Sequence, residues 1–214
     1  TASNNTAVGQ GALNANTTGT RNTAVGRNSL TANTTASENT AVGYIAGDAI
    51  TTGTKNNLFG DSAGTSITTG GQNVAVGNAA LSTATTSSNN TAIGQAALTS
   101  NSTGAGNVAV GNVSLVANTT GEYNVAIGGD ALASNTTAGN NVAVGKNALT
   151  SNISGQYNTA VGRGAGTTVT TGSENVFIGN GSDGTATNTA EANAIGNSVA
   201  GASGYTTLGF SSSD

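Results

Sequence analysis

Hydrophobic and polar positions along this chain recur with a period of 17 residues. A motif of the form Asn-x-Ala-Val-Gly, with Ile, Leu or Phe at the apolar places of some copies, opens each period. The first two copies read "NTAVGQGALNANTTGTR" and "NTAVGRNSLTANTTASE". The Asn of the motif stands at positions 5, 22, 39, 56, 73, 90, 107, 124, 141, 158 and 175. This regular array predicts a repeat architecture.

Each copy predicts one short β-strand and two corners. The triplet after the Asn, Thr/Val-Ala-Val/Ile, alternates in the manner of a strand, for example at residues 6–8. The Gly after the triplet suits a corner, because Gly adopts positive φ without strain. The later "NTTG" segment is rich in turn-forming residues. A repeat of two packed helices would need about 34 residues, and the recurring Gly and Asn would break such helices.

We therefore expect an all-β chain, a β-solenoid or β-prism of about twelve 17-residue coils, assembled as a homotrimeric fibre. Residues 1–191 hold eleven tandem copies and are expected to form the fibre shaft. Residues 192–214 hold degenerate copies and are expected to form a cap or a junction to a further domain. There "ANAIG" at Ala192–Gly196 keeps the register, whereas "YTTLG" at Tyr205–Gly209 arrives four residues early. Because the chain begins at Thr1 without Met, we expect it to be an excerpt or a processed product.

Two positions of the repeat are predicted to build the core. The fourth is apolar in every copy, and the ninth is Leu in seven copies. Three copies have Gly at the ninth position, namely Gly47, Gly64 and Gly166, and in these the twelfth position becomes Ile or Val. Because lost volume must be replaced in a close-packed interior, both positions are expected to fill one cavity. The Asn at the twelfth position of the Leu copies, such as Asn118, is expected to face outward. The predicted core comprises Val8, Val25, Val42, Phe59, Val76, Ile93, Val110, Ile127, Val144, Val161 and Ile178, with Leu13, Leu30, Leu81, Leu98, Leu115, Leu132 and Leu149.

The Asn residues that open the copies are expected to stack at one corner. Their amides can then hydrogen-bond from coil to coil, as Asn side chains do in cross-β stacks. Alternatively, Asn is present because it tolerates the turn conformation, and both interpretations stay open. At the seventeenth position, Arg21, Glu38 and Lys55 follow one another, which predicts opposite charges one coil apart. The corner ladder comprises Asn5, Asn22, Asn39, Asn73, Asn90, Asn107, Asn124, Asn141, Asn158 and Asn175.

The thin core of each coil favours assembly with further chains. About two medium-sized aliphatic side chains per coil have to offset the entropy of ordering seventeen residues. The third and eighth positions are small in most copies, so we expect another chain to approach closely there, in a closed symmetric oligomer. The sequence leaves open whether columns stand side by side or intertwine. These small residues include Ala24, Ala75 and Ala109, and Ala12, Ala97 and Ala148, with Leu58 and Phe177 as bulky exceptions at the third position.

The composition excludes several classes of function. The chain has no His, Cys, Met, Trp or Pro, and its five Lys or Arg are outnumbered by nine Asp or Glu. Ser-His and Cys-His catalytic arrangements are therefore impossible. Nucleic acid is an unsuitable partner for so few basic residues, and no apolar run approaches the roughly 20 residues of a membrane span. Asp48 and Asp61 are interpreted as scattered surface acids rather than as a glycosidase pair. We predict no catalytic, cofactor-binding or metal-binding residues.

The array resembles the repeats of known fibre proteins. "NTAVGQGALNANTTG" and "NVAIGGDALASNTTAG" are similar to the tandem NTAxGxxALxxNTTG arrays of phage tail-fibre proteins and related bacterial fibre proteins, over about residues 4–200. "NVAIG" and "NAIGNS" also resemble the head repeats of trimeric autotransporter adhesins, whose period is shorter. The resemblance implies a homotrimeric, non-catalytic stalk that supports attachment to a host or cell surface, in a virion tail fibre or extracellularly. It implies copies of the chain as partners, and a surface glycan or receptor bound through domains outside this chain.

Two other functions stay open. The thirteenth and fourteenth positions are Thr in most copies, which suggests an ice-binding β-solenoid with Thr ladders. Adjacent strand residues point to opposite faces, however, and a corner is not flat. The other function is a polysaccharide-degrading spike, for which no catalytic cluster is present. The fourteenth-position ladder includes Thr18, Thr35, Thr52, Thr69 and Thr86.

Two sets of residues bear on sugar attachment or sugar binding. The "NTT" segments match the acceptor sequence for N-glycosylation, but as repeat corners they are interpreted as incidental. Tyr44, Tyr123 and Tyr157 stand at variable positions, where we expect them to be exposed. Exposed tyrosines can stack on sugars, but isolated surface tyrosines more often have no binding role. The "NTT" matches begin at Asn16, Asn33, Asn118 and Asn135.

Overall fold

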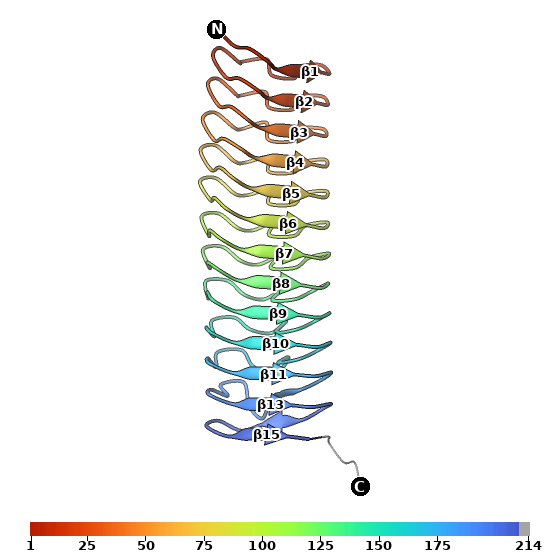
Figure 1. Cartoon of the computed structure of the whole chain (residues 1–214), viewed down its shortest axis with the longest axis vertical. Coiled ribbons are helices and arrows are strands. Elements are labelled where there is room, and N and C mark those ends of the chain that lie inside the picture. Colours follow the sequence, from red (N-terminus) through yellow and green to blue (C-terminus); the bar gives the residue numbers. More distant parts are fainter. Residues whose placement is uncertain (210–214) are drawn as a thin grey trace. The chain divides into compact units, whose positions relative to one another are not determined.

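The computed structural model describes residues 1–209 and contains no helix among them. The fold is an all-β parallel β-solenoid of about 12 coils (Figure 1). The chain divides into two compact units, Thr1–Asn107 and Val108–Asp214. Both units are built from the same 17-residue coil, and each contains its own stack of paired strands.

Within the first unit, successive strands pair in parallel in chain order. Each residue lies beside the residue 17 positions later, as in the pair Ala7 and Ala24. This register confirms the repeat read from the sequence. The strands are β1 (Thr6–Val8), β2 (Thr23–Val25), β3 (Thr40–Val42), β4 (Asn57–Phe59), β5 (Val74–Val76) and β6 (Thr91–Ile93).

The second unit continues the pattern and ends with a change of register. Strands β11 and β13 keep the 17-residue step, whereas β13 pairs with β15 at a step of 13, with Asn193 opposite Thr206. The degenerate copies therefore still form coils. The strands are β7 (Val108–Val110), β8 (Val125–Ile127), β9 (Val142–Val144), β10 (Thr159–Val161), β11 (Val176–Ile178), β12 (Asp183–Gly184), β13 (Asn193–Ile195), β14 (Ala200–Gly201) and β15 (Thr206–Leu208), of which β12 and β14 form a separate two-stranded sheet.

The predicted core at the fourth position is wrong, because these side chains point outward. Successive residues of a strand face opposite sides, and it is the third position that lies inside: Ala24 and Ala126, for example, are completely buried. A coil of 17 residues has a narrow interior, and Ala at this place fits it. The outward residues are Val8, Phe59, Val76, Ile93, Ile127, Val161, Ile178 and Ile195, which are exposed, and Val25, Val42, Val110 and Val144, which are half-exposed.

The same burial corrects the expected contact surface for a partner. The small residues of the third and eighth positions fill the chain's own interior, so another chain cannot approach through them. Ala24, Ala75, Ala109, Ala97 and Ala148 are completely buried, and Ala12 is half-buried.

The ninth position is a core position, as predicted. Its Leu side chains lie inside both units, and Ile50, Ile67 and Val169 of the Gly copies are completely buried. A Cβ atom built at Gly47 would come within 3.1 Å of Ile50 Cδ1, and one at Gly64 within 2.9 Å of Ile67 Cδ1. The ninth and twelfth positions therefore share space in these two copies. The buried leucines are Leu13, Leu30, Leu81, Leu98, Leu115, Leu132 and Leu149.

The bulky third-position residues take part in the same exchange, which sequence reasoning did not anticipate. Leu58 lies 2.7 Å from a Cβ built at Gly47 and 2.8 Å from one built at Gly64. Phe177 lies 2.8 Å from a Cβ built at Gly166. Both Leu58 and Phe177 are completely buried. Large side chains thus enter the interior where Gly at the ninth position leaves room.

The corner ladder of Asn residues is confirmed. In the first unit, the side chain of Asn56 accepts hydrogen bonds from the backbone N–H and the side-chain amide of Asn73, at 3.2 and 3.0 Å. Asn56 also donates to the carbonyl of Gly70 at 3.0 Å. The second unit repeats this, with Asn158 accepting from Asn175. Except for half-buried Asn5, the ladder is completely buried, so its amides satisfy backbone groups that would otherwise lack partners. The members are Asn5, Asn22, Asn39, Asn56, Asn73, Asn90, Asn107, Asn124, Asn141, Asn158 and Asn175.

A second set of Asn residues also lies inside, at the twelfth position. Asn118 was expected to face outward, but it is completely buried. Its amide donates to the carbonyl of Gly121 at 3.0 Å and accepts from Asn135 at 3.0 Å. The expectation failed because polarity was taken to mean exposure, whereas hydrogen bonding within the coil makes burial of an amide acceptable.

Candidate interaction surfaces

The outer face of the strands is an uncharged stripe in each unit. Positions two and four of the coils point outward from this face and contain Thr, Val, Ile, Asn, Phe and Leu, without a charged residue in β1–β11, β13 or β15. Ile127 and Ile178, in the second unit, are 41% and 39% exposed. We call this surface the strand face. An uncharged surface with a regular row of exposed Val and Ile side chains is typical of contacts with another macromolecule.

The two Thr columns have different surroundings. Thr34 and Thr51, at the thirteenth position, donate from Oγ1 to the carbonyl of the same position in the next coil, at 3.3 and 3.2 Å. Thr35 and Thr52, at the fourteenth position, are exposed. One column therefore connects coils, and the other faces solvent. The remaining ladder residues of the fourteenth position, Thr18, Thr69 and Thr86, are exposed as well.

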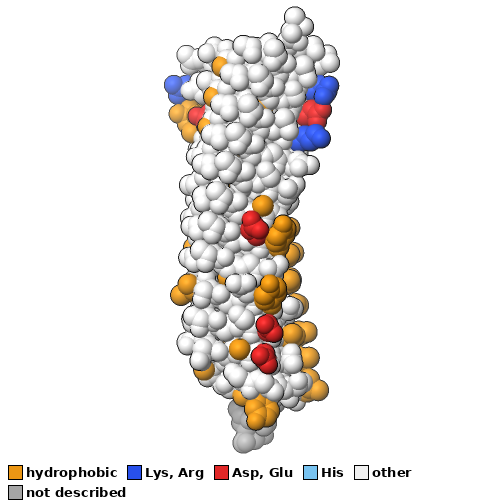
Figure 2. All heavy atoms as spheres, turned by 90° about the vertical axis from the view of Figure 1, so that its left-hand side faces the viewer, with side chains coloured by type: hydrophobic (Ala, Val, Ile, Leu, Met, Phe, Trp, Pro, Cys, Tyr) orange, Lys and Arg blue, Asp and Glu red, His pale blue; other side chains and the backbone are white. Residues whose placement is uncertain are grey.

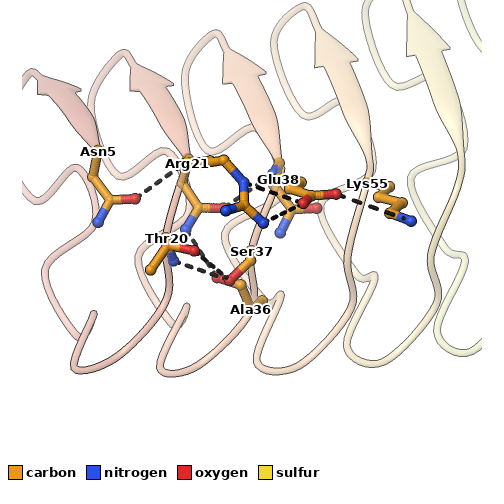
Figure 3. A network of polar contacts seen from close by, with 9 residues as sticks. Asn5, Thr20, Arg21, Ala36, Ser37, Glu38 and Lys55 are labelled. Atoms are coloured by element: carbon orange, nitrogen blue, oxygen red, sulfur yellow. Dashed lines mark hydrogen bonds and ion pairs between the residues drawn. The ribbon is translucent and has the colours of Figure 1, made fainter. Parts of the chain in front are cut away.

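The charged residues at the seventeenth position form the ion pairs expected from the sequence. In the first unit, Glu38 lies between Arg21 and Lys55 (Figure 3). Arg21 donates to Glu38 Oε1 from Nη2 and, at 3.1 Å, from Nε, and Lys55 Nζ lies 4.0 Å from Oε2. The Arg21 hydrogen bonds and then the positive charge of Arg21 lower the pKa of Glu38 below its ordinary value near 4.5. Desolvation opposes this shift of the pKa, and the charge of Lys55 adds to it.

This lowered pKa predicts a small pH dependence of stability. A carboxyl with a lower pKa in the folded state contributes stability above its ordinary pKa and loses it as the pH falls through the folded value. The difference in unfolding free energy between the wild type and Glu38→Gln should therefore be constant at neutral pH and shrink below about pH 4.5. Urea unfolding at a series of pH values measures it. Glu122→Gln is the matched control, because Glu122 makes no ion pair within residues 1–209. A difference that persists unchanged to pH 2 would contradict the assignment.

The tyrosines are exposed, as expected. Tyr44 in the first unit is 46% exposed, and its ring lies 5.6 Å from the guanidinium carbon of Arg27. Tyr123 and Tyr157 in the second unit are 61% and 57% exposed. In Figure 2, hydrophobic and acidic side chains lie next to one another in the lower half of the face shown.

Three of the four asparagines of the glycosylation-like segments are inaccessible in the folded chain. Asn33, Asn118 and Asn135 are completely buried, and Asn16 is half-buried. Their role is in the coil interior, in agreement with the interpretation that the matches are incidental.

Residues 1–209 offer no concave site. No pocket and no group of three or more metal-ligating acids occur among them, and they contain no helix that could span a membrane. The two acids considered in the sequence have separate local roles: Asp48 accepts a hydrogen bond from Thr65 at 2.8 Å, and Asp61 accepts one from Ser62 at 2.6 Å. The surfaces left for function are the strand face and the exposed corners.

No protein-family model, curated protein or solved structure matches this chain. The function of this chain is therefore inferred from the geometry of these surfaces and from the repeat itself.

Proposed function

We propose that this chain is a structural, non-catalytic segment of a homotrimeric attachment fibre, exposed on a virion or a cell surface. The strand face is the observation that carries the proposal. It is uncharged, it extends through the coils of each unit, and it presents Val and Ile side chains to solvent. A second copy has the same regular spacing of coils, so its strand face can pack on this one without a change of register.

The free energy gained by burying the strand face favours an oligomer. Burying a fully exposed Val or Ile is worth about 1.5–3 kcal/mol, and a strand-face side chain such as Ile127, which is 41% exposed, gains the corresponding part of it. The interior of a single coil is narrow. Copies related by a closed rotation bury the stripe on every chain. The number three comes from the resemblance of the repeat to trimeric fibre proteins. Attachment to a receptor is assigned to domains outside this chain.

Introducing a charge on the strand face should separate the copies without unfolding them. We expect Ile127→Asp to reduce the solution mass from that of a trimer to that of a monomer, since the new carboxylate would be buried unpaired at the interface. Light scattering at several concentrations measures this, and circular dichroism checks the fold. Thr137→Asp at the exposed fourteenth position of the same coil is the control and should remain trimeric. A folded, monomeric wild type would refute the proposal.

An ice-binding solenoid is the second candidate. The exposed Thr column at the fourteenth position favours it, because hydroxyls repeat there once per coil. The thirteenth-position hydroxyls are engaged with carbonyls of neighbouring coils, which leaves one regular Thr column rather than two. Inhibition of ice recrystallisation, and its loss in a variant with Thr120→Lys and Thr137→Lys, would support this candidate over the fibre.

A further inference from the structure

Two tyrosines in the second unit occupy the same place in the repeat. Tyr123 and Tyr157 both stand at the seventeenth position, in the segments "GEYN" and "GQYN". Each is more than half exposed. Each is preceded by an exposed polar residue, Glu122 or Gln156, and followed by a buried Asn of the corner ladder. We call Tyr123, Tyr157 and the residue before each, Glu122 and Gln156, the tyrosine corner.

Backbone hydrogen bonds hold this corner in register from coil to coil. The N–H of Asn140 donates to the carbonyl of Glu122 at 3.0 Å, and the N–H of Glu174 donates to the carbonyl of Gln156 at 3.0 Å. Tyr123 and Tyr157 are therefore two coils apart, a separation of about 9.6 Å along the stack. The coil between them has Gly139 and Asn140 at the corresponding places, so no bulky side chain stands between the two rings.

The backbone at this position is unfavourable for an aromatic residue. Tyr123 has a φ of 56° and Tyr157 a φ of 58°, in the left-handed region that bulky residues rarely adopt. Every copy has a positive φ at this place, on residues as different as Arg21 and Lys55, so the conformation belongs to the coil. Asn89 and Asn140 occupy it in two other coils, and Asn tolerates it well. Exposed tyrosines at strained positions gain little from packing within the chain. The exposure of two tyrosines at one repeat position, rather than a strain that all copies share, points to a role in binding.

The chemistry of the corner defines the ligand. The face of a Tyr ring is electron-rich and apolar, so it packs against the C–H groups of a sugar ring. Glu122 and Gln156 provide acceptors and an amide donor for sugar hydroxyls. The two-coil separation is close to the length of a disaccharide unit in an extended β-linked chain, which presents equivalent sugar faces at that interval.

The charge at and near the corner disfavours anionic polymers. In the second unit, the sixteenth and seventeenth positions contain Glu122, Glu174 and Glu191 but no Lys or Arg. A field of this sign repels uronic-acid or sulfated chains. The first unit differs, since its seventeenth position holds the Arg21–Glu38–Lys55 ion pairs and no aromatic residue.

We infer that the tyrosine corner of the second unit binds a neutral, extended β-1,4-linked polysaccharide, with one sugar ring stacked on Tyr123 and another on Tyr157. The chain itself then contributes glycan contacts along its length, beyond its role in the fibre and independent of its oligomeric state.

Titration of the intact chain with defined oligosaccharides tests this inference. The probes are cellohexaose and mannohexaose as neutral β-1,4 chains, and maltohexaose as the α-1,4 control. Calorimetry measures affinity, and tyrosine fluorescence is a second signal, because two of the four Tyr lie in the corner and the chain has no Trp. We expect at least one β-1,4 hexaose to bind, and maltohexaose to bind at least about tenfold more weakly.

Variants at the two tyrosines separate stacking from other effects. The double variant with Tyr123→Asn and Tyr157→Asn should weaken binding by about tenfold or more. It should keep or raise the melting temperature, because Asn suits this backbone conformation. The corresponding double change to Phe should retain most of the affinity, and Tyr44→Asn in the first unit should leave it unchanged. The inference is overturned if no β-1,4 hexaose binds, if maltohexaose binds equally well, or if the double Asn variant binds like the wild type.

Discussion

Gly128→Ala is expected to destabilise the second unit by about 3–5 kcal/mol. Gly128 follows strand β8 and has a φ of 129°, a conformation that strains any residue with a Cβ atom. A Cβ atom at this place would also lie 2.6 Å from the carbonyl carbon and oxygen of Gly145 in the next coil. These are backbone atoms, fixed by the hydrogen bond from the Gly145 N–H to the Ile127 carbonyl at 2.7 Å, so the collision cannot be relieved by a rotamer change.

The neighbouring Gly129 is the control for this prediction. A Cβ atom at Gly129 would meet only the carbonyl oxygen of Asn112, at 3.8 Å, which is ordinary van der Waals contact. Gly129→Ala should therefore change the unfolding free energy by less than about 0.5 kcal/mol. Urea unfolding followed by circular dichroism compares the two variants. If both variants had the same unfolding free energy, the close approach of successive coils at the fifth position would be contradicted.

The sequence predicted the fold because its period is strict and its corner residues are distinctive. Gly at the fifth position and Asn at the first require particular backbone conformations or buried hydrogen bonds, so their recurrence identified the coil and its ladder. Which side chains of the strand point into the coil was harder to infer. Val110 and Ala109 are both apolar, and choosing the larger one for the interior ignored the small cross-section of a 17-residue coil. Small residues in a thin solenoid mark the inside.

The candidate surfaces could be predicted only in part. The exposure of Tyr123 and Tyr157 followed from their place at variable positions, but their left-handed backbone could not be read from Tyr itself. The strand face was missed because its Val and Ile residues were assigned to the core. The burial of Asn118 was missed because its partner, the carbonyl of Gly121, lies in the backbone and leaves no mark in the sequence.

A large side chain at the third position can replace the Leu that is missing at the ninth position of the preceding coil. This leads to a prediction with two substitutions. Leu115 is completely buried, as is Ala126 in the following coil. Where Gly stands at the ninth position, a large third-position residue occupies the space: Phe177 lies next to Gly166 of the preceding coil. The pair of Leu115→Gly and Ala126→Leu would reproduce this arrangement. Asn118→Ile is a less suitable partner, because it would remove the amide bonds of Asn118.

We expect Leu115→Gly alone to cost about 2–5 kcal/mol through the cavity that it leaves. The backbone offsets a little of this loss, since Leu115 has a φ of 49° and Gly adopts such angles freely. Ala126→Leu alone should overpack the interior and cost about 1–3 kcal/mol. The double variant should recover part of both losses, with a favourable coupling of about 1–3 kcal/mol.

A second cycle shows whether the coupling depends on contact. Ala160 occupies the same repeat position as Ala126 but stands three coils from Leu115, about 14 Å along the stack. Leu115→Gly and Ala160→Leu should therefore give additive effects, within about 0.5 kcal/mol. Urea unfolding of the wild type, the three single variants and the two double variants yields both coupling energies. Additivity in the Leu115 and Ala126 cycle would mean that these side chains do not share a cavity, and that the large residues Leu58 and Phe177 are accommodated by local changes in the backbone instead.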